Sequence, residues 1–217
     1  MKLFNNNKLK SNVVFIIFFL SNYYILKTML KNKIKFREIK ISDAKKILDW
    51  RKKDRITNFQ FTDINNSLKL QKNWIVKSYE QADYYHWLVM FKNKLIGFIS
   101  INGINLRKSE ATWSWYVGEE KYFTLGGYIP PYFYNWVFKN LKINKIYANV
   151  FENNYNVIQI HKLHGYKTLK KVYKINKNNK KVRYIKMILS KNKWDFKKYE
   201  KYVADFPTLK WKKREKI

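Results

Sequence analysis

The chain has 217 residues, of which 46% are hydrophobic and 18% aromatic, so its composition excludes a disordered protein and predicts one globular domain with extensions. The absence of cysteine excludes disulfides, thiolate zinc sites and cysteine nucleophiles, and it fits the reducing cytoplasm in which we expect the protein. The net charge is +31, but only six of the 46 basic residues are the arginines that nucleic-acid readers favour. We therefore interpret the basicity as AT-rich codon bias, on a surface that still attracts anionic ligands.

Residues 1–33 differ from the rest of the chain, since no acidic residue precedes Glu38 and the stretch 13–20 is continuously apolar. That stretch is too short to span a membrane, which takes ~20 residues. It has the outline of a signal peptide but no small-residue cleavage site. We expect this extension to reflect a true start at Met29, with a membrane-proximal anchor as the alternative.

From Ile34 onward, periodicity and turn residues predict alternating strands and helices. In chain order they are a strand at 35–40, a helix capped by Ser42-Asp43, a helix after Asn66-Ser67, a hairpin of strands 85–91 and 95–101, and a strand at 111–117. A helix at 129–141, a strand at 145–150, a helix at 157–163 and strands near 168–174 and 182–189, joined by the turn 176–180, complete the set. This order predicts an α/β fold (α+β, with a mixed twisted sheet and helices on both faces) over residues 34–190. Residues 191–217 are expected to form a basic helical tail, with Trp194 and Phe196 packed on the domain.

The stretch after the strand at 111–117 carries Gly126-Gly127 and then Pro130-Pro131. Glycines before a helix let backbone N–H groups approach an anion, which the helix dipole also favours. The prolines are tolerated only in the first helical turn. The stretch indicates either an anion site or simply good turn chemistry, and by itself it does not separate the two.

A second element strengthens the anion-site interpretation. Residues Asn154, Val157, Ile158, Ile160, His161, Gly165 and Tyr166 resemble the GNAT acetyltransferase signature Asn-x-x-Ala-Ile-x-Leu-Tyr-x-x-x-Gly-Phe. At GNAT spacing, the phosphate loop Arg/Gln-x-x-Gly-x-Gly/Ala falls on Lys121, Thr124 and Gly126. The resemblance covers about residues 34–194 and implies the GNAT fold, acetyl-CoA as co-substrate and no metal.

The sequence departs from the family pattern at four positions. Lys121 replaces the usual Arg or Gln, and His161 stands where many relatives have a tyrosine. Thr112 lies near the position of a glutamate that some relatives carry. Thr124 replaces the first loop glycine, and its amide can still bind phosphate if the position does not need a positive φ.

The resemblance also implies roles for individual residues. The backbone N–H groups of Tyr116 and Val117 would bind the pantetheine arm and polarise the thioester carbonyl, and Asn154 would bond the pantetheine or nearby backbone. The pyrophosphate would be held by the loop residues Lys121, Tyr122, Phe123, Thr124, Leu125, Gly126 and Gly127. His161 would act as general acid to the thiolate, or alternatively only hydrogen-bond the cofactor or pack against the sheet. His86 is the best candidate for a general base, with a structural role as its alternative.

Within the family, the chain is most similar to acetyltransferases acting on UDP-4-amino-4,6-dideoxy sugars in the pseudaminic acid pathway. The similarity rests on Asp49-Trp50-Arg51, Trp74, the turn 125–131 and the run 161–166. It implies direct attack by the amine in a ternary complex. Arg51, Gln60 and Trp74 are the candidates for binding the nucleotide sugar, through a bidentate diphosphate contact and stacking on uracil; a surface ion pair and core packing are the alternatives for Arg51 and Trp74.

Two other function classes stay open at this point. A RimJ/RimL-like enzyme that acetylates protein N-termini would share the fold and the acetyl-CoA site. A non-catalytic basic module binding nucleic acid or a membrane would share only the charge.

Overall fold

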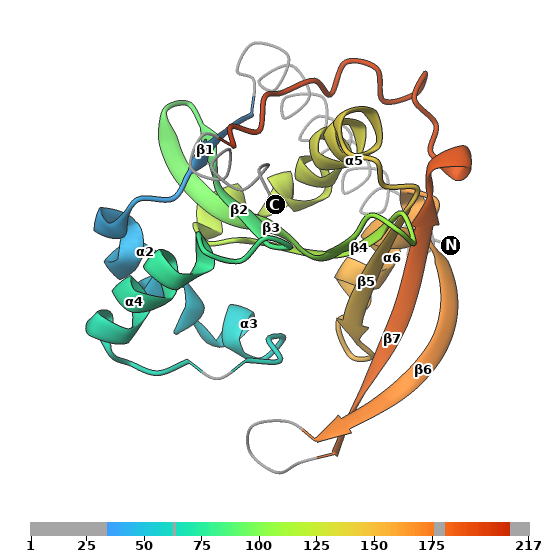
Figure 1. Ribbon diagram of the computed structural model, residues 1–217. Helices are drawn as coiled ribbons and strands as arrows, with labels where there is room; N and C mark the ends of the chain where they lie inside the picture. The colour runs from blue at the N-terminus through green and yellow to red at the C-terminus, as the bar shows by residue number, and fades with distance from the viewer. Residues whose placement is uncertain (1–33, 63, 176–180, 209–217) are drawn as a thin grey trace, which may run out of the picture.

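The computed structural model describes residues 34–62, 64–175 and 181–208 (Figure 1). The N-terminal extension 1–33 and the turn 176–180 lie outside these residues. In the described ranges, no helix combines the length and the apolar character needed to cross a membrane.

Seven strands form one mixed sheet in the order β1-β2-β3-β4-β5-β7-β6, which confirms the predicted fold class. The strands are β1 (Lys35–Glu38), β2 (Tyr85–Phe91), β3 (Lys94–Asn105), β4 (Glu110–Val117), β5 (Lys145–Phe151), β6 (Lys167–Ile175) and β7 (Lys181–Ser190). The helices are α2 (Ala44–Arg51), α3 (Asp54–Thr57), α4 (Leu68–Ser78), α5 (Ile129–Asn140) and α6 (Tyr155–Leu163). The 3-10 helices are η1 (Ile41–Asp43), η2 (Glu120–Gly127) and η3 (Lys191–Lys193). The short helix α3 was not predicted.

Local chemistry explains several of these boundaries. The Ser67 hydroxyl caps α4 by accepting from the Leu70 amide at 3.3 Å. Lys92 and Asn93 both have positive φ, 49° and 59°, as the tight turn between β2 and β3 requires. Pro130 and Pro131 occupy the first turn of α5, where a missing N–H costs no helical hydrogen bond.

The helices cover the sheet on both faces (Figure 1). On one face, α5 and α6 pack against β4 and β5 and build the larger core around Trp113, Phe133 and Ile158. On the other face, α2 and α4 build a smaller core that includes Trp50 and Leu88. Successive strand residues alternate between these two cores, as side chains do on a sheet with both faces buried.

Among the described strands, β4 and β5 are the one parallel pair, and they pair only briefly. Their register covers Glu110↔Lys145 to Thr112↔Tyr147, and past that point the two strands continue without pairing with each other. The start of the pair is fixed by Ser109, whose carbonyl accepts from the amides of Asn144 at 2.7 Å and Lys145 at 3.1 Å. Beyond Thr112 the two strands therefore leave an opening in the middle of the sheet.

The predicted helical tail is wrong for residues 194–208, which follow η3 as turns and then without regular secondary structure; its end, 209–217, lies outside the described residues. The buried Asn135 of α5 explains the difference. Its side-chain amide donates to the carbonyls of Tyr199 at 2.8 Å and Tyr202 at 2.9 Å, and its oxygen accepts from the Trp194 indole at 2.8 Å. Trp194, Tyr202 and Phe206 are buried against α5. Packing and these bonds hold the segment as a strap rather than a helix.

We expect Asn135→Ala to destabilise the protein by about 2–4 kcal/mol, because it leaves two carbonyls and one indole N–H buried without partners. Urea unfolding would measure this loss. Asn140→Ala, at the exposed end of the same helix, is the matched control and should stay within about 0.5 kcal/mol of the wild type. Equal stability of the two variants would contradict the assigned role of Asn135.

Candidate active site

A cavity of about 380 Å³ opens between β4 and β5 where their pairing stops. Its walls come from residues 113–117 of β4, 148–151 of β5, 153–157 with Ile160 and His161 of α6, Phe123 and Gly126 of η2, and Arg55, Ile56, Phe59 and Gln60 of α3 and the following loop. Of the predicted site residues, Tyr116, Val117, Phe123, Gly126, Asn154, His161 and Gln60 line it. A cavity of this size and position suits an extended ligand that replaces the missing strand contacts.

The hydrogen-bond alternation of β4 decides which backbone amides face the cavity. The Gly118 amide donates to the Ile96 carbonyl of β3 at 2.7 Å, and Tyr116 pairs with Phe98 of the same strand. In an antiparallel ladder every second residue directs both backbone groups at the partner strand. Tyr116 therefore directs its amide at β3, whereas Trp115 and Val117 direct theirs toward the cavity. Of the two amides predicted to bind pantetheine, that of Val117 therefore faces the cavity and that of Tyr116 does not, while the Trp115 amide, which was not predicted, also faces it.

The predicted phosphate loop is the 3-10 helix η2 rather than an open loop. Thr124 and both glycines have φ outside the positive range, so threonine fits the position where relatives carry glycine. However, a 3-10 helix bonds its own amides, and the Tyr122 amide donates to the Glu119 carbonyl at 3.1 Å. The prolines remove two more N–H groups at the start of α5. The loop thus offers fewer amides to an anion than predicted, and nearby cationic side chains gain importance.

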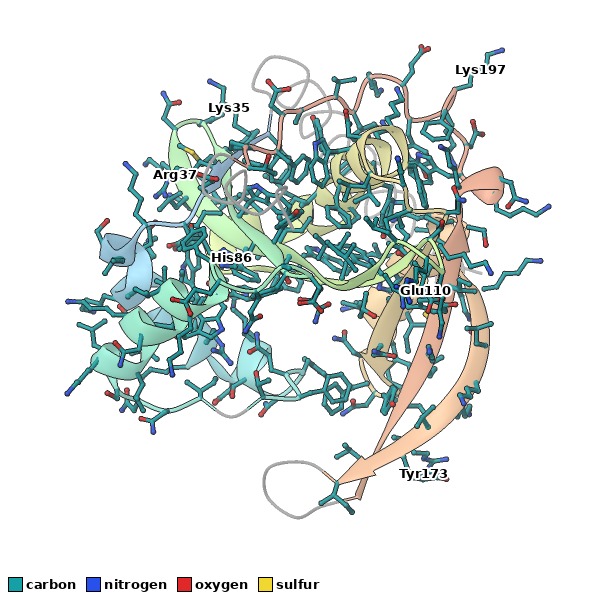
Figure 2. The ribbon with its side chains drawn as sticks, viewed as in Figure 1. Lys35, Arg37, His86, Glu110, Tyr173 and Lys197 are labelled. Carbon is teal, nitrogen blue, oxygen red and sulfur yellow. The ribbon has the colours of Figure 1, made fainter. Side chains whose placement is uncertain are left out.

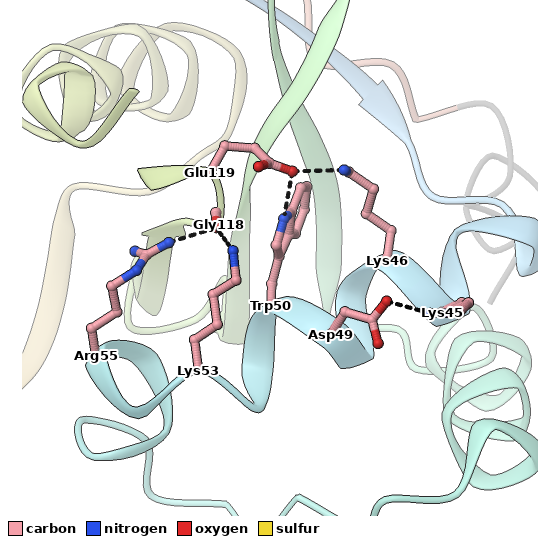
Figure 3. Close-up of polar contacts among 8 residues, drawn as sticks. All are labelled: Lys45, Lys46, Asp49, Trp50, Lys53, Arg55, Gly118 and Glu119. Atoms are coloured by element: carbon pink, nitrogen blue, oxygen red, sulfur yellow. Dashed lines mark hydrogen bonds and ion pairs between the residues drawn. The ribbon is translucent and has the colours of Figure 1, made fainter. Parts of the chain in front are cut away.

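Those cations come from α3 and from Lys53 just before it, a contribution that the sequence analysis missed (Figure 3). The Arg55 guanidinium donates to the carbonyls of Val117 at 2.8 Å and Gly118 at 2.6 Å, and the Lys53 ammonium donates to Gly118 at 3.0 Å. Arg55 also lies 5.9 Å from the centre of the Phe123 ring. In the sequence, Lys53 and Arg55 belong to the charged segment 51–55, which looks like ordinary surface charge. Folding places it at the end of β4, between the cavity and η2.

The same end of β4 is fixed to α2 through Trp50 (Figure 3). A Cβ on Gly118 would lie 2.1 Å from the Trp50 ring, so only glycine fits. The Glu119 carboxylate accepts from the Lys46 ammonium at 2.6 Å and from the Trp50 indole at 3.0 Å. The hydrogen bond from Lys46 lowers the pKa of Glu119 and keeps this carboxylate charged. The turn into η2 is therefore held at a defined position.

Two of the three residues predicted to bind a nucleotide sugar lie together. Arg51 donates to the Gln60 side-chain oxygen at 3.0 Å and to the Thr62 hydroxyl at 2.9 Å. The third, Trp74, packs 5.3 Å from the ring of His86 and 6.3 Å from that of Phe98, on the α2–α4 side of the sheet. Arg51 and Trp74 do not line the cavity itself, and only Gln60 reaches it.

His86 lies in the interior, on the side of the sheet that α2 and α4 cover (Figure 2). Its Nε2 is 2.5 Å from the Ser78 hydroxyl, and the aromatic rings of Trp74, Tyr79, Tyr84 and Phe98 surround it. It does not line the cavity. This placement supports the structural alternative for His86 over a role as general base.

His161 lines the cavity, and its ring packs edge-on to Trp115 at 5.3 Å and lies 4.5 Å from the ring of Tyr166. Burial, with a smaller contribution from the neighbouring His164, lowers the pKa of His161 to about 3. The imidazole is therefore neutral at physiological pH. Neutral imidazole can hydrogen-bond a ligand but does not supply the proton of an imidazolium, which favours the binding or packing alternative over general acid.

Asn154 sits at the cavity edge, at the start of α6. Its backbone is engaged in the turn, since its amide donates to the Phe151 carbonyl at 2.9 Å and its carbonyl accepts from Ile158 at 3.1 Å. Its side chain makes no capping hydrogen bond. The side chain is thus the part of Asn154 that a cavity ligand can use.

Comparison with known proteins agrees with the fold and the family expected from the sequence. Residues 36–189 match the sequence profile of the acetyltransferase (GNAT) domain. A crystal structure of spermidine N-acetyltransferase from Vibrio cholerae in complex with CoA and spermine is 16% identical, with a TM-score of 0.66 over 74% of this chain and 97% of that chain. A domain from Methanocaldococcus jannaschii is 18% identical, with a TM-score of 0.59 over 73% and 99%. Comparison with curated protein sequences gives no match.

We expect acid to destabilise the protein through His161. The unfolded imidazole binds a proton near pH 6.5, whereas the buried ring stays neutral to about pH 3, so the stabilising difference is complete above pH 6.5 and is lost as the pH falls. Between about pH 7.5 and pH 5 the wild type should lose about 2 kcal/mol more of its unfolding free energy than His161→Gln. Urea unfolding at both pH values measures this. Lys162→Gln, on the exposed side of the same helix, should keep the wild-type pH dependence; a His161→Gln variant that does the same would contradict the argument.

Proposed function

Because the chain belongs to the acetyltransferase (GNAT) family, we propose that it acetylates the 4-amino group of a UDP-amino-dideoxy sugar in surface-glycan biosynthesis of the pseudaminic-acid type. It is an acetyl-CoA-dependent N-acetyltransferase, and the acetyl group moves by direct attack of the amine in a ternary complex. The observation that carries the choice of acceptor is the charge around the cavity. Arg51 lies beside it, bonded to the lining residue Gln60, and no carboxylate is found among its described lining residues.

This charge distribution opposes a polyamine acceptor. A polyamine is a polycation and needs acidic groups to pair its ammonium ions, whereas this chain carries a net charge of +31. A nucleotide sugar is an anion, and Arg51 offers its diphosphate a planar, charged donor. The spermidine enzymes among the structural neighbours share the fold at 14–16% identity, which does not extend to the acceptor.

In the reaction, acetyl-CoA supplies the acetyl group and the protein supplies position and charge. The amides of Trp115 and Val117 would hold the pantetheine arm along β4, and one of them would donate to the thioester oxygen as negative charge develops there. The side chain of Asn154 would bond the same arm from α6. Arg55, Lys53 and Lys121 would surround the phosphates. The attacking nitrogen must lose a proton and the leaving sulfur must gain one; since His161 is neutral and His86 is remote, exchange with cavity water is the simplest route.

A panel of amines tests the acceptor class directly. We expect release of free CoA with a UDP-4-amino-4,6-dideoxy sugar, and little release with spermidine or with peptides bearing a free N-terminus. A thiol-reactive dye follows the release continuously. Turnover of spermidine or a peptide in preference to the sugar would reject the proposed acceptor while leaving the acetyltransferase assignment in place.

We expect Arg55→Ala to weaken acetyl-CoA binding about tenfold or more, because it removes a cation at the cavity and frees the carbonyls of Val117 and Gly118. Isothermal calorimetry measures the affinity. Lys52→Ala is the matched control, since it removes the same charge from an exposed neighbouring position. If both variants weaken binding equally, the net charge of the segment is responsible, and not the hydrogen bonds from Arg55 to the Val117 and Gly118 carbonyls.

A further inference from the structure

Tyr116 carries a polar group that the mechanism above does not use. Its ring stacks on Phe98 at 5.3 Å with an interplanar angle of 11° and meets Trp50 edge-on at 6.4 Å. This places the side chain on the α2–α4 face of β4, where Arg51 lies, and Tyr116 also lines the cavity. Its side chain therefore lies between the cavity, which we propose for the acyl donor, and the face of the sheet with Arg51, which we propose for the acceptor.

The Tyr116 hydroxyl is buried and has no hydrogen-bond partner among the residues that the structure describes. A buried hydroxyl without a partner costs stability, so such a group in a native protein calls for a specific reason. Phenylalanine would stack on Phe98 equally well without that cost. The hydroxyl is therefore better explained by a partner that arrives with the substrate.

The surroundings indicate what kind of partner it is. Burial raises the pKa of Tyr116, so its hydroxyl keeps its proton and can donate. Arg51, at the end of α2, bonds Gln60, which lines the same cavity as Tyr116. Ser114, two residues earlier on the same face, is exposed in the cavity and bonds Ser100 at 3.0 Å. This region offers hydrogen-bond donors and matches an acceptor molecule rich in oxygen.

We propose that the Tyr116 hydroxyl donates a hydrogen bond to an oxygen of the acceptor close to its reacting amine, and so selects oxygen-bearing amines such as amino sugars over polyamines. The inference rests on the proposed function for the identity of the acceptor. The side chain acts on the substrate and not on acetyl-CoA, whose contacts with β4 come from the backbone. Tyr116 is on this account a specificity-determining residue.

Tyr116→Phe separates this role from a structural one. We expect kcat/KM for the amino-sugar nucleotide to fall about tenfold or more, because the substrate oxygen loses its donor in a buried site. Acetyl-CoA affinity should be unchanged, and the melting temperature should be equal or higher, since an unpaired hydroxyl has been removed. Tyr79→Phe is the matched control. The Tyr79 hydroxyl donates to the Ile39 carbonyl away from the cavity, so this variant should lose stability and keep its kcat/KM.

The proposal is overturned if Tyr116→Phe keeps its kcat/KM, or if it loses stability as Tyr79→Phe does. The experiments distinguish a failure of this proposal from a failure of the proposed function. Sugar turnover that does not change in Tyr116→Phe rejects only the role of Tyr116. Turnover of peptides alone rejects the sugar, but the variant still decides the role of Tyr116, because a peptide has a carbonyl oxygen near its amine. Turnover of spermidine alone rejects both, since a polyamine offers no oxygen.

Discussion

The parallel pairing of β4 with β5 stops after Thr112↔Tyr147, and the rest of the site depends on that interruption. Past this point, the cavity-facing backbone groups of β4 have no strand partner, although buried peptide groups need one. The protein satisfies some of them with side chains, as when Arg55 bonds the Val117 carbonyl at 2.8 Å. The amides of Trp115 and Val117 face the cavity, where the amide groups of a pantetheine arm can extend the sheet.

Packing on both faces of the sheet fixes the position of β4 beside the opening. Trp113 stacks on Phe133 of α5 at 5.0 Å and donates its indole N–H to the Tyr166 hydroxyl at 2.6 Å, which fixes β4 from one side. On the other side the Trp50 ring fills the space beside Gly118. The Trp115 indole bonds the Gly126 carbonyl at 3.2 Å and ties η2 to the same strand. Packed side chains thus border the opening, and the segment from Arg51 to Gln60, which includes α3, contacts the end of β4 through Arg55.

Much of the fold could be predicted from the sequence, because the residue periodicity and turn residues that set its helices and strands act locally. The strands, the paired prolines and the Ser67 cap are examples, and the motif around Asn154 and His161 located the cavity wall. Features set by distant contacts could not be predicted. Arg55 binds backbone carbonyls more than 60 positions away, which leaves no trace in the sequence. The strap at 194–208 depends on Asn135 in the same way, and the neutrality of His161 depends on burial that only the folded chain creates.

Residue-resolved amide hydrogen exchange with and without acetyl-CoA tests the central claim most directly, namely that the opening between β4 and β5 holds the acyl donor. The account predicts that saturating acetyl-CoA slows exchange at the amides of Trp115 and Val117, and leaves the Tyr116 amide, already bonded to β3, nearly unchanged. Stabilisation of the protein by acetyl-CoA without added protection at Trp115 and Val117 would contradict it, because the donor would then bind elsewhere.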